Sequence, residues 1–220
     1  MTLSVIIPTL NAARHLEATL AALRPAPEVV VTDGGSTDGT ADIVRMADRT
    51  LIAGPRGRGR QLALGAEHAG GEWLLFLHAD TILSPGWDAA AEAIIGSGNS
   101  GIAAYFRFAL DSPAPQARRL ERMVTWRSAA LGLPYGDQGL FISRTLYRAV
   151  GGYRPLALME DADLVRRIGS GRLHPIPVNA VTSAARWERE GWNRRSARNL
   201  LCLALYFAGL PTGAIQRIYG

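Results

Sequence analysis

The chain has 220 residues, is 48% hydrophobic and 20% charged, and is expected to form a single globular domain with a full core. Its net charge is +5 and it contains no lysine, which excludes a Schiff-base lysine, a P-loop lysine and a lysine nucleophile and leaves anion binding to arginine. The single cysteine, Cys202, excludes a disulfide framework and a multi-cysteine metal site, and we do not infer a nucleic-acid partner from the arginine content.

The first half of the chain alternates strands and helices. Strands are predicted at residues 4–7, 28–32, 51–53 and 73–80, and helices at residues 12–23, 41–49, 60–69 and 87–95. We expect residues 1–8 to form the first strand rather than a signal peptide, because they lack a basic segment and a cleavage site. Asn11 is the expected N-cap of the first helix. The alternation predicts an α/β fold with a mostly parallel, doubly wound sheet and right-handed crossovers.

The second half has a different pattern. Strands are predicted at residues 101–110, 139–143 and 176–178, and helices at residues 113–131, 145–150, 161–168 and 194–208. No repeat or interdomain linker interrupts it. No apolar run reaches the roughly 18 residues of a transmembrane helix, and Pro211 interrupts the nearest candidate, residues 199–215. We therefore expect a cytoplasmic protein.

The strand predicted at residues 73–80 ends in polar side chains. Five apolar residues from Trp73 to Leu77 are typical of a strand buried on both faces, and His78 and Asp80 follow them. Ligands bind at the carboxyl edge of open α/β sheets. A His-x-Asp pair at that edge can hold a divalent cation, which can in turn hold a diphosphate. The alternative is that Asp80 caps a helix or turn beginning near Thr81.

A polar, glycine-rich turn follows the second strand, at residues 33–40. Asp33 ends that strand, and a carboxylate there suits ribose hydroxyls or the edge of a base. The spacing is not the G-x-G-x-x-G fingerprint of dinucleotide sites. The alternative is a tight turn in which Thr37 or Asp38 caps the next helix.

Four sequence blocks, in order, resemble inverting glycosyltransferases of family 2, which have the GT-A fold. The blocks are SVIIPTLN, VVVTDGGSTDGT, GRGRQLALGAEHAGGEWLLFLHAD, and GDQGLFISRTLYRAVGGY with LMEDADL, and they cover most of residues 3–170. Within the family, the chain is most similar to small soluble bacterial members described as radical-SAM/selenodomain-associated transferases. The resemblance implies a GT-A, Rossmann-like sheet with a nucleotide-binding half (1–98), an acceptor-side half (99–190) and a C-terminal helical tail (191–220).

The resemblance also implies which residues bind the donor sugar nucleotide. These are Pro8, Thr9, Asn11, Asp33, Gly34, Arg56, Arg60, His78, Ala79 and Asp80. For the two arginines, a solvated basic loop is the alternative. His78-Ala79-Asp80 occupies the place of the D-x-D motif, so Asp80 and His78 are the implied metal ligands, and the imidazole favours Mn²⁺ over Mg²⁺. Ala12 departs from the family, whose members often carry an acidic residue there.

On the acceptor side, inverting transfer requires a general base. The resemblance assigns that role to Asp161, with Glu160 as the alternative, and the N-terminus of a helix keeps such a carboxylate ionised. A purely structural N-terminal cap is the other interpretation of this pair. Asp137 and Gln138 are implied to position the acceptor or the leaving diphosphate.

Arg186 and Trp187 resemble a shortened Q-x-x-R-W block of processive members, with serine at position 183. The pair either closes over the diphosphate or acceptor, or is a surface arginine beside a core tryptophan. Three arginines at 194, 195 and 198 precede the apolar run 200–207. Such a helix can lie on an anionic membrane or be buried on the sheet or in a dimer, and burial is the favoured interpretation.

The expected function is metal-assisted, inverting transfer of a sugar from a nucleoside-diphosphate sugar to a hydroxyl acceptor, with an aspartate base. The alternative is a non-catalytic sugar-nucleotide-binding or scaffold protein. The sequence does not identify the hydroxyl acceptor, for which a lipid and a small molecule are two candidates. Peripheral contact with the inner face of the membrane through residues 194–215, and a homodimer, both stay open.

Overall fold

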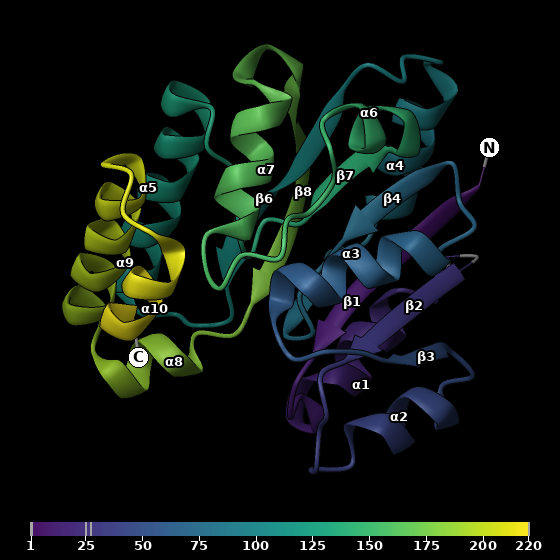
Figure 1. The fold of residues 1–220 in the computed structure, drawn as a ribbon, viewed down its shortest axis with the longest axis horizontal. Coiled ribbons are helices and arrows are strands. Elements are labelled where there is room, and N and C mark those ends of the chain that lie inside the picture. Colours follow the sequence, from purple (N-terminus) through teal and green to yellow (C-terminus); the bar gives the residue numbers. More distant parts are fainter. Residues whose placement is uncertain (1, 25, 27, 220) are drawn as a thin grey trace.

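The protein is built on one eight-stranded mixed sheet with the order β3-β2-β1-β4-β7-β6-β8-β5 (Figure 1). The computed structural model describes residues 2–24, 26 and 28–219. The strands are β1 (Leu3–Thr9), β2 (Glu28–Asp33), β3 (Thr50–Ala53), β4 (Trp73–Phe76), β5 (Thr81–Leu83), β6 (Ala103–Leu110), β7 (Leu140–Ser143) and β8 (Leu173–Thr182).

Parallel pairing is confined to two parts of the sheet. Strands β3, β2, β1 and β4 run parallel, as the first half of the sequence predicts. β7 is antiparallel to both β4 and β6, β8 is parallel to β6, and β5 is antiparallel to β8. The predicted α/β fold with a helix-flanked sheet is confirmed, but its doubly wound parallel part ends at β4.

Two apolar cores cover the two faces of the sheet. Val5 and Ile7 of β1 point into one core and Ile6 into the other, as the two-residue period of a strand requires. The first core is covered by α1 (Ala13–Ala22), α2 (Thr40–Met46) and α4 (Trp87–Gly96). The second is covered by α3 (Arg58–His68), α6 (Arg144–Ala149) and α7 (Glu160–Ile168).

A third cluster lies where the C-terminal helices join the sheet. It is formed by β6, α5 (Pro115–Leu131), α8 (Ala185–Glu190) and the first residue of α9 (Trp192–Phe207). A short 3-10 turn, Ser170–Arg172, precedes β8, and α10 (Thr212–Tyr219) packs against α9. α9 buries Cys202 and Leu203 but exposes Leu200 and Leu201, so the expected burial of this helix holds for one of its faces. Among the described residues, no helix is both long and apolar enough to cross a membrane.

Two local predictions are wrong. The strand predicted at residues 73–80 ends at Phe76, because its partner β7 begins at Leu140, directly opposite Phe76. The chain then turns, and Thr81–Leu83 forms an edge strand rather than the start of a helix. Asn11 does not cap α1: its φ is +52°, and the side chain of the capping residue, Ala12, offers no acceptor.

Candidate active site

Asp33 lies at the carboxyl edge of the sheet, where β1 and β2 end side by side. Its Oδ1 accepts a hydrogen bond from Thr9 Oγ1 at 2.9 Å, and its Oδ2 accepts from the backbone N–H groups of Gly35 and Ser36 at 3.0 and 2.8 Å. Burial would raise the pKa of Asp33, but a hydrogen bond from Ser36 Oγ, together with the three just named, lowers it overall. Asp33 is therefore an ionised carboxylate that shapes the glycine-rich turn.

Asn11 connects the loop after β1 to that turn. Its N–H donates to Ser36 Oγ at 2.8 Å, and its Oδ1 accepts from the Thr37 N–H at 2.9 Å. The left-handed backbone of Asn11 allows both contacts, and asparagine tolerates this conformation better than most residues. Hydrogen bonds through Asn11 therefore hold together the loop after β1 and the turn after β2, which the family resemblance assigns to the nucleotide.

Gln61 of α3 is a member of this edge that the sequence analysis missed. Its Nε2 donates to the carbonyl oxygens of Thr9 and Thr32, both at 2.7 Å. A Cβ at Gly34 would lie 3.2 Å from the Gln61 amide, so glycine allows this close packing. Pro8 is half-buried one residue before Thr9. The predicted residues of the first two turns therefore lie together.

A second group lies after β4. The loop between α5 and β7 carries Asp137 to His78, whose Nδ1 is 2.7 Å from Asp137 Oδ1. One potential ligand atom from each of His78, Asp80 and Asp137 lies within 4.8 Å of the others. Ala79 between them is half-buried, and its carbonyl oxygen accepts a hydrogen bond from Thr19 at 2.9 Å. The structure thus adds Asp137 to the two residues predicted as metal ligands.

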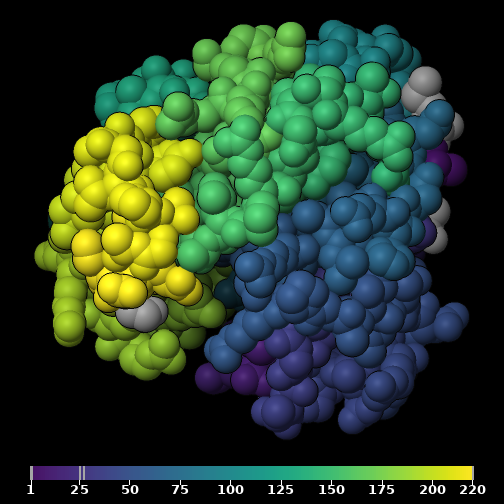
Figure 2. Space-filling view, in the orientation of Figure 1, coloured from purple at the N-terminus to yellow at the C-terminus, as the bar shows by residue number. Residues whose placement is uncertain are grey.

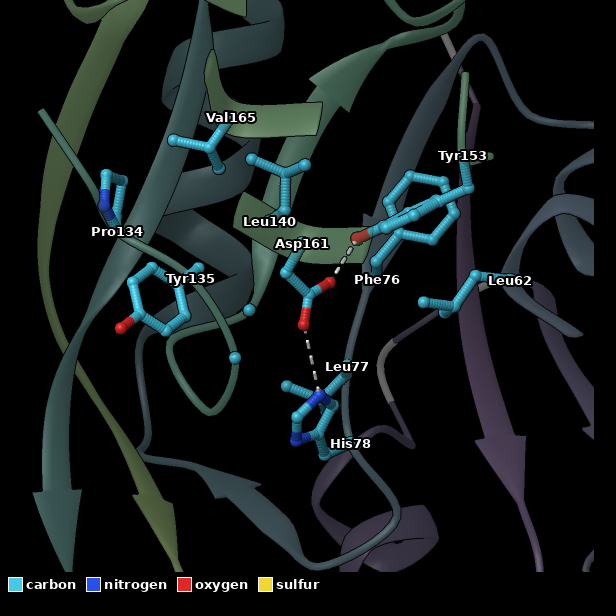
Figure 3. Close-up of a pocket in the computed structure, with 12 residues that line it drawn as sticks. Leu62, Phe76, Leu77, His78, Pro134, Tyr135, Leu140, Tyr153, Asp161 and Val165 are labelled. Carbon is cyan, nitrogen blue, oxygen red and sulfur yellow. Dashed lines mark hydrogen bonds and ion pairs between the residues drawn. The ribbon is translucent and has the colours of Figure 1, made fainter. Parts of the chain in front are cut away.

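Asp161, in the first turn of α7, faces this group across a small pocket (Figure 3). The Tyr153 hydroxyl donates to its Oδ1 at 2.8 Å. Its Oδ2 lies 3.8 Å from His78 Nε2 and 3.5 Å from Arg58 Nη2. That oxygen is buried and, within the part of the chain that the structure describes, accepts no hydrogen bond. The side chain of Tyr135 lines the same pocket.

The charges around Asp161 control two protonation states. Burial would raise the pKa of Asp161, but Arg58 and His78 hold it well below its usual range. Burial would lower the pKa of His78, but its hydrogen bond to Asp137 and the carboxylate of Asp161 raise it to about 10. In the structure without ligands, Asp161 is therefore ionised and His78 is protonated at neutral pH.

Glu160 has a different environment. Its side chain is 2% exposed and forms an ion pair and hydrogen bond with Arg58 Nε. Burial would lower the pKa of Arg58, but Glu160 and Asp161 raise it well above its usual value. Arg58 thus bridges the two carboxylates, and it holds Glu160 more closely than Asp161.

The sequence analysis singled out Arg56 and Arg60, and the structure shows both exposed. The residue between them, Arg58, makes the contact with α7 because α3 begins at Arg58 rather than at residue 60. The alternating R-x-R-x-R spacing was the available signal, but it does not say which arginine faces inward.

Three further predicted site residues, Gln138, Arg186 and Trp187, have surroundings that a purely structural role explains. Gln138 is 2% exposed; its Oε1 accepts from Ser128 Oγ at 2.9 Å and its Nε2 donates to the Phe106 carbonyl at 3.2 Å. It therefore anchors the loop that carries Asp137. Trp187 is buried in the third cluster and Arg186 is exposed, which agrees with the structural interpretation of that pair.

Comparison with known proteins agrees with this architecture. Residues 4–154 match the family described as "Glycosyl transferase family 2". A PGL/p-HBAD biosynthesis glycosyltransferase of Mycobacterium bovis is 41% identical over 91 residues, a match that spans 36% of each chain, about a third of that relative's length. The succinoglycan biosynthesis protein ExoA of Rhizobium meliloti is 28% identical over 235 aligned residues, covering 90% of this chain and 69% of ExoA.

Solved structures show the same fold. Glucosyl-3-phosphoglycerate synthase from Mycobacterium tuberculosis, in complex with Mn²⁺, UDP and glucosyl-3-phosphoglycerate, aligns with a TM-score of 0.62 at 20% identity, covering 91% of this chain and 78% of that one. S. aureus TarS (residues 1–349) aligns with a TM-score of 0.64 at 19% identity, covering 100% and 69%. The sheet is therefore the expected GT-A sheet, and the chain belongs to glycosyl transferase family 2, a family of glycosyltransferase enzymes.

Proposed function

We propose that this protein transfers a sugar from a nucleoside-diphosphate sugar to a hydroxyl acceptor, with inversion at the anomeric carbon. One observation carries the proposal: Asp161 Oδ2 is buried, ionised and free of hydrogen bonds within the described chain, and it faces a pocket next to His78. Arg58 and His78 lie within ion-pair distance of this oxygen but form no hydrogen bond with it, so it is available to a ligand that donates a proton.

In the proposed reaction, the acceptor hydroxyl supplies that proton. Asp161 Oδ2 takes it while the hydroxyl oxygen forms a bond to the anomeric carbon, and the bond from that carbon to the phosphate oxygen breaks. The nucleoside diphosphate leaves from the opposite face of the sugar, which inverts the anomeric centre. Tyr153, bonded to Oδ1, keeps Oδ2 directed at the pocket. Glu160 is the poorer candidate because Arg58 already engages its carboxylate.

His78, Asp80 and Asp137 are the residues that would hold a divalent cation. His78 would release its proton on binding, and its imidazole nitrogen with two carboxylate oxygens, all within 4.8 Å of one another, is a donor set that suits Mn²⁺ and accepts Mg²⁺. The bound cation would neutralise charge on the diphosphate leaving group. Glucosyl-3-phosphoglycerate synthase from Mycobacterium tuberculosis has been solved with UDP and either Mn²⁺ or Mg²⁺, which is consistent with this assignment.

The donor nucleotide is proposed to occupy the edge formed by Pro8, Thr9, Asn11, Asp33 and Gly34. Exposed Arg56 and Arg60 are free to approach its phosphates. This division corresponds to one domain with a nucleotide half (1–98), an acceptor half (99–190) and a helical tail (191–220). Placement in the radical-SAM/selenodomain-associated subgroup stays a prediction.

The test is release of nucleoside diphosphate from UDP-, GDP- and dTDP-sugars, with and without Mn²⁺, by wild type and variants. Asp161→Asn is expected to remove turnover while leaving donor affinity within a few-fold, because the amide cannot accept the proton. Asp80→Ala and Asp137→Asn are expected to weaken Mn²⁺ binding measured directly by calorimetry. Asp42→Asn is the matched control, because Asp42 lies in an exposed ion pair with Arg45 on α2.

Metal-dependent hydrolysis of one donor, lost in Asp161→Asn and retained in Asp42→Asn, would support the proposal and identify the donor. Wild-type turnover retained in Asp161→Asn would refute the assignment of the base. Mn²⁺ binding unchanged in both Asp80→Ala and Asp137→Asn would refute the assignment of the metal site.

A further inference from the structure

Large apolar side chains are exposed mainly at one end of the molecule. Among the described residues, eight of the ten exposed large hydrophobic side chains lie on α5, α9, α10 or the turn between α9 and α10. Trp126 is 61% exposed and Leu200 is 66% exposed. Figure 1 shows these three helices gathered at the end of the molecule away from β1–β3, and Figure 2 shows α10 at the surface there. Clustered exposed apolar groups indicate an interaction surface.

On these helices, exposed arginines lie near the exposed apolar side chains. On α5, Arg119, Arg122, Met123 and Trp126 are all exposed and occupy positions i, i+3, i+4 and i+7 of one face. On α9, exposed Arg194 precedes exposed Leu200 and Leu201, while Cys202 and Leu203 face inward. The two helices meet where Trp192, the first residue of α9, packs against the third cluster, which contains buried residues of α5. We call their exposed residues Arg122, Met123, Trp126, Arg194, Leu200 and Leu201 the basic apolar surface.

The charge of these helices has one sign. α5 carries four arginines, α9 three and α10 one, against a single carboxylate, Glu121. Glu121 is mostly buried and paired with Arg118 at 2.9 Å. Within the described chain, Arg119, Arg122 and Arg194 form no ion pair. The exposed face therefore has positive charge that the protein does not neutralise.

We propose that the basic apolar surface docks peripherally on anionic membrane lipid. Apolar side chains of surface helices enter the boundary between headgroups and acyl chains, while arginines contact lipid phosphates. A second copy of the chain is a poorer occupant, because a two-fold interface would bring together two faces that both have unpaired positive charge. Membrane contact needs no spanning helix, and it involves none of the residues around Asp161.

The test is co-sedimentation of the full chain with two kinds of vesicle, one of phosphatidylcholine alone and one that also contains about 30% phosphatidylglycerol. Each is measured at low and at high salt, because salt screens the attraction between arginines and anionic lipid. Binding is expected only to the phosphatidylglycerol vesicles, and less at high salt. Each of Arg122→Gln and Arg194→Gln is expected to lower the partition constant about five-fold, and the double variant about 25-fold. Leu200→Gln with Leu201→Gln is expected to lower it by at least about ten-fold.

Arg14→Gln and Met46→Gln are matched controls. Arg14 is exposed on α1 and Met46 is 79% exposed on α2, both outside the basic apolar surface. Unchanged urea unfolding of the surface variants would show that they fold. Equal binding to neutral vesicles, no vesicle binding, or equal losses in the control variants would each overturn the proposal. So would a concentration-dependent dimer, seen by analytical ultracentrifugation, that Leu200→Gln dissociates.

Discussion

Replacing Arg58 with methionine tests the charge balance of the site most directly. The substitution keeps an unbranched apolar stem but removes the guanidinium that bridges Glu160 and Asp161. The two carboxylate side chains are 2% and 10% exposed, so water cannot solvate them fully after the change. Both would stay in the folded protein with less compensating charge, and the free energy of unfolding should fall.

The magnitude follows from burial. Removing one partner of a fully buried ion pair costs about 3–5 kcal/mol, whereas an exposed pair contributes about 0–1 kcal/mol. The Arg58 side chain is 41% exposed, so its loss should cost an intermediate amount, about 2 kcal/mol. For a chain of this size, that corresponds to a decrease in Tm of about 4–8 °C.

The assay is urea unfolding at pH 7, followed by tryptophan fluorescence. Arg60→Met is the matched control, because Arg60 lies two residues away on α3 and is exposed; its cost should be within about 0.5 kcal/mol. Adding Glu160→Gln to Arg58→Met should recover more than half of the loss, because it removes one uncompensated charge. Equal stability of Arg58→Met and Arg60→Met, or further loss in the double variant, would refute the reasoning.

Three other predictions concern single contacts. Tyr153→Phe removes the hydrogen bond to Asp161 but keeps the ring, so the loss of stability should be about 1.5–3 kcal/mol and turnover should fall; unchanged urea unfolding would contradict this. Gly59→Ala would place a Cβ 2.5 Å from a backbone carbonyl oxygen and should lower the free energy of unfolding by about 1–3 kcal/mol. Gly96→Ala is the control: Gly96 has open space around it, so thermal melts should show no loss of stability for that variant. Because folding lowers the pKa of Asp33, wild type should exceed Asp33→Asn in stability by about 1–2 kcal/mol at pH 7, and the difference should shrink as pH falls through and below the usual carboxyl pKa of about 3.9. A pH-independent difference in urea titrations would contradict that assignment.

The sequence by itself determined the class of fold and the edge of the sheet where the site lies. Apolar runs such as residues 29–31 and 73–77 are local signals of buried parallel strands. Asp33 is the last residue of β2, and His78 lies two residues beyond β4. Since the carboxyl ends of parallel strands meet at one edge, these residues had to lie near one another. The family blocks extended the prediction to Asp161 on α7, more than 80 residues beyond His78.

Only the tertiary structure decided which members of a local pattern face the site. All three arginines are exposed, but only Arg58 pairs with the carboxylates of α7 within the described chain, because the start of α3 and its close approach at Gly59 set the rotation of the helix. Asp137 joins His78 while adjacent Gln138 turns into the core, since successive side chains of a loop point in different directions. Such choices depend on packing between segments far apart in the chain, which no local periodicity encodes.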